Sequence, residues 1–172
     1  MTGSILIAPE YENVEGPLIF LAGPIQGAYN WQEQAISLIN SLDSEMNIAS
    51  PRRRIKHEGE FTENMYNEQV DWETHYLNRA AEKGAVMFWL AKESEHVCHR
   101  AYAQTSRFEL AEWKVLHQIY HSKMVVGIEE GFTGHRYIEK RFSQDCPEVP
   151  VLSSLEETCT KAVEFANQSR NI

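Results

Sequence analysis

The stretch Ile19-Phe20-Leu21-Ala22-Gly23-Pro24 decides the fold that we predict for this chain. It is a short apolar run that ends in a Gly-Pro turn, and a helical pattern led by Trp31 follows from Asn30. A buried strand that ends in this way leaves a loop at its carboxyl end, the edge of an open α/β sheet where small molecules bind. Glycine lets the backbone approach a ligand closely and proline fixes the exit direction, although an ordinary strand-to-helix turn has the same sequence.

Strand-like apolar runs and helix-like patterns alternate along the rest of the chain. We expect strands over residues 17–21, 46–49, 85–90, 124–128 and 149–152, with 4–8 as a possible short extra edge strand. We expect helices over about 30–43, 67–82, 106–121 and 154–167. In the third of these, the apolar residues at helical spacing are Phe108, Ala111, Val115 and Ile119, which predicts an amphipathic helix with this side toward the core. The alternation predicts a five-stranded parallel sheet with helices on both faces.

Composition narrows the class of protein. The chain has 172 residues with 42% apolar content, which predicts a single globular domain over 1–172. A formal net charge of -9 disfavours binding to nucleic acid, because phosphate backbones attract clustered positive charge. Three cysteines without paired spacing indicate reduced thiols. No stretch resembles a signal peptide or reaches membrane-spanning length, so we expect a cytoplasmic protein with no membrane partner.

Glu109 is the residue that we single out for chemistry. It lies at the start of the predicted helix that follows strand 85–90 and its loop. Ser106-x-x-Glu109 matches a capping box, in which the carboxylate would only bond back to the helix cap. The same location suits a nucleophile, because the helix dipole and nearby N–H groups would hold the carboxylate ionised. A positioned, ionised carboxylate is what covalent glycosyl transfer requires.

Two segments of the chain resemble the motifs of a known enzyme family. Phe20-Leu21-Ala22-Gly23-Pro24 resembles the first-strand signature Tyr-Leu-Ala-Gly-Pro of the nucleoside 2-deoxyribosyltransferase family, and Ser106 to Trp113 resembles its nucleophile segment. Ala49-Ser50-Pro51-Arg52-Arg53 and Gln69-Val70-Asp71-Trp72-Glu73 lie between them, so the similarity covers about 17–130 and resembles a divergent branch. The resemblance implies a flavodoxin-like (Rossmann-like) three-layer sandwich, a homo-oligomer with shared active sites, and cleavage of the N-glycosidic bond of a 2-deoxyribonucleoside through Glu109.

The chain also departs from the pattern of that family. Phe20 stands where the family has a tyrosine whose hydroxyl helps to hold the nucleophile. The two aspartates that recognise and protonate the base fall at positions 83–84 and at Ala103, where this chain has no acid. Asp71, our first candidate for the acid/base, or Glu73 can substitute for these two aspartates, because both are expected to lie near the cleft.

The remaining candidate residues concern substrate binding. The basic run Arg52-Arg53-Arg54, with Lys56 and His57, is either a solvated loop or a clamp for a 5'-phosphate. Trp72 and Trp89 are either core residues or an aromatic platform under a base. Ser106 is expected near the 5' side of the sugar. The residues expected to line the pocket are Phe20, Ala22, Gly23, Pro24, Ile25, Arg53, Trp72, Trp89 and Ser106.

We expect no redox cofactor and no metal. His96-Val97-Cys98-His99 looks like a metal-ligand cluster but lacks a second pair at zinc spacing. The expected partner is a small nucleoside or nucleotide. Three activities remain open on this fold: transfer of the sugar to a second base, hydrolysis by a nucleotide N-glycosidase, and non-catalytic nucleotide binding.

Overall fold

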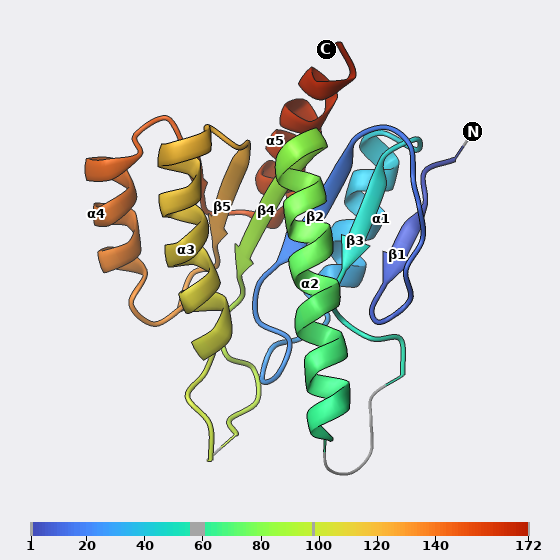
Figure 1. Cartoon of the computed structure of the whole chain (residues 1–172). Coiled ribbons are helices and arrows are strands. Elements are labelled where there is room, and N and C mark those ends of the chain that lie inside the picture. The colour runs from blue at the N-terminus through green and yellow to red at the C-terminus, as the bar shows by residue number, and fades with distance from the viewer. Residues whose placement is uncertain (1, 56–60, 98, 172) are drawn as a thin grey trace.

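The computed structural model describes residues 2–55, 61–97 and 99–171, and it contains one parallel sheet of six strands. The strands are β1 (Ile5–Ile7), β2 (Leu18–Ala22), β3 (Asn47–Ser50), β4 (Gly84–Leu90), β5 (Met124–Ile128) and β6 (Val151–Leu152). The helices are α1 (Trp31–Leu42), α2 (Glu63–Lys83), α3 (Gln104–Tyr120), α4 (His135–Asp145) and α5 (Leu155–Asn167), followed by the 3-10 turn η1 (Gln168–Asn171). Helices cover both faces of the sheet, so the predicted α/β three-layer arrangement is confirmed (Figure 1).

The strand order is β1-β3-β2-β4-β5-β6, and every neighbouring pair is parallel. The sixth strand is β1, the segment that we expected only as a possible extra strand; Ile5 pairs with Ile48 at the edge of β3. After β2 the chain moves to one side of that strand for β3 and then to its other side for β4. The carboxyl ends of β2 and β4 are therefore the topological switch point, where open α/β sheets bind ligands.

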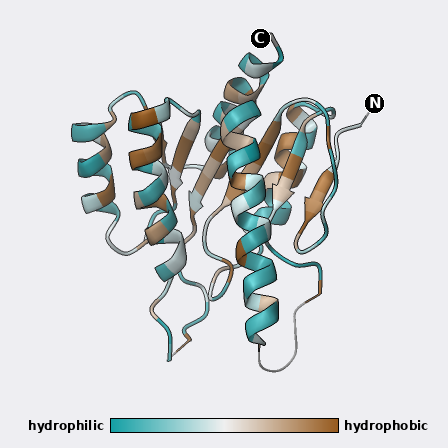
Figure 2. Cartoon of the chain, viewed as in Figure 1, coloured by the Kyte–Doolittle hydropathy of each residue, from teal (hydrophilic) through white to brown (hydrophobic). Residues whose placement is uncertain are grey.

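Two apolar clusters lie on the two faces of the sheet. Within β2, Leu18 and Phe20 belong to the cluster under α2, α3 and α4, whereas Ile19 and Leu21 belong to the cluster under α1 and α5. All five residues of β2 are buried, as a strand covered on both faces requires. The strands are accordingly the most apolar part of the chain in Figure 2. Among the described residues, no helix is long and apolar enough to cross a membrane.

Two helix starts follow the predicted capping chemistry. At α1, the amide of Glu33 donates to Asn30 Oδ1 over 3.3 Å and Asn30 Nδ2 donates to Glu33 Oε2 over 3.0 Å. At α5, the amide of Glu157 donates to the Ser154 hydroxyl oxygen over 3.2 Å. Helix α2 begins four residues before the predicted start, because the Thr62 hydroxyl accepts from the Met65 amide and caps it there. Helix α4 was not predicted, since its sequence is mostly polar.

Helix α3 corrects two expectations. It begins at Gln104 after Ala103, which has the left-handed φ of 55° and makes no side-chain cap. Ser106 therefore lies inside the first turn, and the predicted capping box with Glu109 does not form.

The predicted core-facing side of α3 is also wrong. Phe108, Val115 and Ile119 are 74%, 50% and 59% exposed, and Ala111 is exposed as well. The buried side of α3 consists of Ser106, Leu110, Trp113 and His117. The helix thus carries apolar residues on two opposite sides, and their periodicity does not tell which side is buried against the sheet.

Candidate active site

The candidate site lies at the carboxyl ends of β2 and β4. Gly23 follows β2 directly and has a φ of +150°, a conformation that is essentially restricted to glycine. A Cβ atom at this position would lie 2.2 Å from the carbonyl oxygen of Trp89 and 2.8 Å from the ring of Trp31. The backbone of Gly23 therefore packs directly against β4, and the Gly-Pro turn belongs to the switch point, as predicted.

Arg52 anchors the loop that follows β2. Its Nε donates to Gln32 Oε1 over 2.8 Å, and its Nη2 donates to the carbonyl oxygens of Ile25 and Tyr29 over 3.0 and 3.1 Å. The hydrogen bonds of the guanidinium group therefore hold residues 25–29 in place. The structure thus favours a structural role for Arg52 over the predicted phosphate clamp, while Lys56 and His57 of the same basic run lie outside the described residues.

A second loop, described over residues 91–97 and 99–103, contacts the first. The Ser94 amide donates to the Gly27 carbonyl oxygen over 2.8 Å, and the Tyr102 hydroxyl donates to the Ala91 carbonyl oxygen over 2.6 Å. Arg100 also donates to the Gln26 side chain. The bonds from Ser94 and Arg100 fix the two loops to each other at the carboxyl edge of β2 and β4, while the bond from Tyr102 joins the two ends of the second loop.

Glu109 is half-buried in the second turn of α3, and among the described residues its carboxylate has no hydrogen-bond or ion-pair partner. Burial, then the negative charge of Glu73 and then that of Glu112, raise its pKa from 4.5 to about 8. The expectation that the helix dipole keeps this group ionised is therefore wrong. The dipole acts mainly on the first turn, and Glu109 lies beyond it in a desolvated position.

Glu73 of α2 is also half-buried, and its negative charge acts on Glu109. Its Oε1 accepts from Gln69 Nε2 over 2.9 Å, and Gln69 Nε2 also donates to the carbonyl oxygen of Pro51 over 2.8 Å. Arg53 Nε donates to Gln69 Oε1 over 2.9 Å, which fixes the orientation of the amide. Burial raises the pKa of Glu73, while the bond from Gln69 opposes that rise.

Asp71 does not share this location. It is exposed, and its charge acts on Tyr11, whose pKa it helps to raise on the side of α2 near the β1–β2 connection. Two positions apart on an α-helix correspond to about 200° around the axis, so Asp71 and Glu73 point in nearly opposite directions. Of the two acids that the sequence offered, Glu73 is the one whose charge acts on Glu109.

The two tryptophans do not form a platform. Trp72 lies in the cluster under α2, 6.1 Å from the Phe20 ring, and its Nε1 donates to the Glu10 carbonyl oxygen over 2.8 Å. Trp89 lies in the cluster on the opposite face of the sheet, where its Nε1 donates to the Tyr29 hydroxyl over 3.3 Å. Both are core residues, and the sheet separates them.

The other predicted lining residues differ in exposure. Phe20, Ala22, Pro24 and Ser106 are buried, whereas Gly23, Ile25 and Arg53 are half-buried at the carboxyl edge. The last three, together with Glu73 and Glu109, are the predicted residues that remain accessible at the switch point. Ser106 lies in the first turn of α3, one turn before Glu109.

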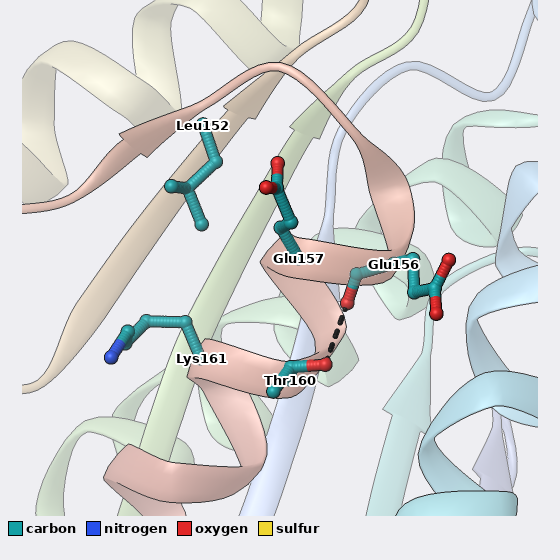
Figure 3. Close-up of a pocket in the computed structure, with 5 residues that line it drawn as sticks. All are labelled: Leu152, Glu156, Glu157, Thr160 and Lys161. Atoms are coloured by element: carbon teal, nitrogen blue, oxygen red, sulfur yellow. Dashed lines mark hydrogen bonds between the residues drawn. The ribbon is translucent and has the colours of Figure 1, made fainter.

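A separate hollow of about 330 Å³ lies beside α5, on the face of the sheet opposite α3. Its lining residues are Leu152, Glu156, Glu157, Thr160 and Lys161. Figure 3 shows that Glu156 points away from Glu157 and Lys161, and that the Thr160 hydroxyl donates to the Glu156 carbonyl oxygen within the helix. The hollow is therefore remote from Glu109. Within the described ranges, no three His, Cys, Asp or Glu residues are grouped closely enough to hold a metal ion.

The raised pKa of Glu109 predicts a pH-dependent stability difference. Its folded-state pKa of about 8 exceeds the unfolded value of 4.5, so the stability that this group contributes is lost as pH rises toward and through 8. Glu109→Gln removes the titration. We expect the variant to match the parent near pH 5 and to exceed its free energy of unfolding by about 2–4 kcal/mol near pH 9.

Urea denaturation at several pH values measures this difference, and Glu82→Gln, which removes an exposed charge from α2, is the control. A constant difference between Glu109→Gln and the parent over this pH range would contradict the raised pKa.

Comparison with known proteins gives a family match. The family model described as nucleoside 2-deoxyribosyltransferase-like matches residues 16–132, which include β2, Gly23, Glu73 and Glu109. No curated protein sequence matches the chain. Among solved structures, a conserved protein from Enterococcus faecalis V583 is similar with a TM-score of 0.48 and 11% identity, over 90% of this chain and 99% of that one.

Proposed function

Because this chain belongs to the nucleoside 2-deoxyribosyltransferase-like family, we propose that it breaks the N-glycosidic bond of 2-deoxyribonucleosides or their 5'-monophosphates. The observation that carries the proposal is Glu109, a half-buried carboxylate without a partner among the described residues, beside the switch point of the sheet. A carboxylate that the fold leaves unpaired in a desolvated position is costly to maintain, and such groups cluster at functional sites.

The proposed reaction has two steps through Glu109. A carboxylate oxygen of Glu109 bonds to the anomeric carbon while the bond to the base breaks, and the electron pair of that bond goes to the base nitrogen. The transition state has oxocarbenium character, and a glycosyl ester of Glu109 results. In the second step a second base or water attacks the same carbon and releases Glu109. In this proposal Gly23 and Ile25, at the end of β2, contact the substrate.

Product analysis tests this function. The protein is incubated with a pool of deoxynucleosides and, separately, with their 5'-monophosphates. A deoxynucleoside with an exchanged base identifies a transferase, and free base without exchange identifies a hydrolase. Ligand binding without either product contradicts the proposed reaction. That outcome supports the second candidate, a nucleotide-binding module, which is favoured by the lack of an acid at positions 83–84 and 103.

Arg53 is the proposed contact for a 5'-phosphate. Its Nη2 reaches the Met65 carbonyl oxygen over 3.4 Å and its guanidinium lies 5.2 Å from the Phe61 ring, while Nη1 has no partner among the described residues. We expect Arg53→Ala to weaken binding of a deoxynucleoside monophosphate by about 1.5–3 kcal/mol, the range for hydrogen bonds to charged groups. Binding of the nucleoside is expected to change little.

Calorimetric titration with both ligands measures the difference, and Arg54→Ala, at an exposed neighbour, is the matched control. An equal loss for nucleoside and monophosphate would rule out the phosphate contact.

The outward side of α3 supports the expected homo-oligomer. Phe108, Val115 and Ile119 are exposed at helical spacing on the helix that carries Glu109, and exposed apolar patches mark interaction sites. In Figure 2, α3 shows apolar turns where α2 is mostly polar. We propose that a second copy of the chain covers this side and that Phe108→Asp with Ile119→Asp yields a monomer. Sedimentation measures the change, and a parent protein that sediments as a monomer would refute it.

A further inference from the structure

We infer that Glu73 is the proton partner of Glu109: the proton that Glu109 gives up before attacking the sugar passes to Glu73, which then donates it to the departing base. This assignment rests on the proposed function of Glu109. It supplies a general acid to a chain that lacks acids at the two positions where the family has its base-contact aspartates.

The two carboxylates belong to helices that cover the same face of the sheet (Figure 1). Trp72 and Leu110, the chain neighbours of Glu73 and Glu109, lie in one apolar cluster, and both acids are half-buried beside it. After burial, the charge of Glu73 contributes most to the raised pKa of Glu109. Two neighbouring carboxylates in a desolvated site resist being ionised together, so the pair retains one proton near neutral pH. Glycosidic cleavage needs one ionised carboxyl group as the nucleophile and one protonated carboxyl group as the general acid.

The two carboxylates differ in their surroundings. Glu73 accepts a hydrogen bond from Gln69 Nε2, which favours its ionised form, whereas Glu109 has no partner among the described residues. The hydrogen bond from Gln69 therefore favours the shared proton on Glu109 in the free protein and leaves Glu73 able to accept it. Positive charge developing on the sugar favours ionised Glu109, which completes the transfer.

The proton balance closes over the two steps. In the first, Glu109 loses its proton to Glu73 and bonds to the anomeric carbon. The bond to the base breaks, and the base takes the proton from Glu73. In the second, the incoming base or water gives a proton to Glu73 as it bonds to the same carbon, and Glu109 leaves as a carboxylate. The proton then returns from Glu73 to Glu109, which restores the starting state.

Gln69 is the positioning residue for this acid. Its Nε2 bridges Glu73 and the Pro51 carbonyl oxygen, and its Oε1 accepts from Arg53, so the amide cannot present its oxygen to Glu73 without losing these bonds. Asp71 has no such support and lies on the other side of α2, beside Tyr11. Among the described residues, the other acid whose charge acts on Glu109 is Glu112, which is exposed one turn beyond it.

The test compares two leaving groups in the full-length protein. A neutral purine deoxynucleoside needs a proton on its departing base, whereas deoxyribosyl nicotinamide, a pyridinium, releases a neutral base without one. We expect Glu73→Gln to lower turnover of the purine nucleoside by about 10²–10⁴-fold, the range for loss of a general acid, and to change turnover of the pyridinium far less. Glu82→Gln is the control for the loss of a charge from α2.

Gln69→Leu provides a second variant that leaves both carboxylates in place. Without the hydrogen bond that favours ionised Glu73, the pH–rate profile on the purine nucleoside should move to higher pH. Equal losses on both substrates in Glu73→Gln, or the leaving-group pattern in Asp71→Asn instead, would overturn the role of Glu73. Full activity of Glu109→Gln on both substrates would overturn the proposed function itself.

Discussion

Glu109→Gln is expected to lower nucleoside turnover by at least about 10³-fold, the scale seen when a covalent nucleophile is removed. Glutamine has nearly the same shape as glutamate but cannot form the glycosyl ester. Binding of the nucleoside should survive, because Gly23 and Ile25 are unchanged. Single-turnover kinetics and a binding titration on the same preparation measure the two quantities separately.

The matched control is Glu112→Gln, which removes an exposed carboxylate one turn further along α3. It should retain turnover close to that of the parent. A folded Glu109→Gln variant with near-parental turnover would contradict the covalent mechanism at this residue. Loss of folding would instead assign Glu109 a structural role, although the absence of a partner for its carboxylate among the described residues argues against that outcome.

Gly23→Ala is expected to destabilise the fold by about 3 kcal/mol, which adds the strain of a glycine-only conformation to the cost of overpacking. The new Cβ would meet backbone at 2.2 Å, the carbonyl oxygen of Trp89, which cannot move without disturbing β4. For a chain of this size the midpoint of thermal unfolding should fall by roughly 6–12 °C. Calorimetry or circular dichroism measures the shift.

Gly16→Ala separates the two contributions. Gly16 also has a left-handed φ, +83°, but its Cβ would meet nothing closer than Asn47 Nδ2 at 3.9 Å. This variant should therefore show only the strain, about 1 kcal/mol. Similar losses in Gly16→Ala and Gly23→Ala would mean that the close approach of β2 and β4 does not constrain the Gly-Pro turn.

The sheet was predictable because its strands are buried on both faces. Continuous apolar runs with adjacent glycines occur at residues 17–21 and 85–90. Such runs can be recognised in the sequence without knowing which strands lie beside them. The location of Glu109 followed from the same logic, since the helix after a parallel strand begins at the carboxyl edge. The helix caps at Asn30 and Ser154 could also be predicted, because each depends only on residues within three positions in the sequence.

What the sequence could not reveal depends on packing. Asp71 and Glu73 are two residues apart, and only the rotation of α2 about its axis decides which one faces Glu109. Helix α3 has apolar residues on opposite sides, and only contact with the sheet selects Leu110 and Trp113 for burial. The pKa of Glu109 depends on desolvation by elements distant in the chain, so the local helix position suggested the wrong direction.

Trapping the glycosyl ester tests the central claim most directly. The parent protein is mixed with excess deoxynucleoside, quenched in acid within one turnover and digested with trypsin, which cuts after Arg107 and Lys114. The account predicts that the peptide Phe108–Lys114 gains the mass of one deoxyribosyl group, that fragmentation places it on Glu109 rather than Glu112, and that Glu109→Gln gains none. Turnover with the peptide unmodified at every quench time, or with the sugar on another residue, would contradict it.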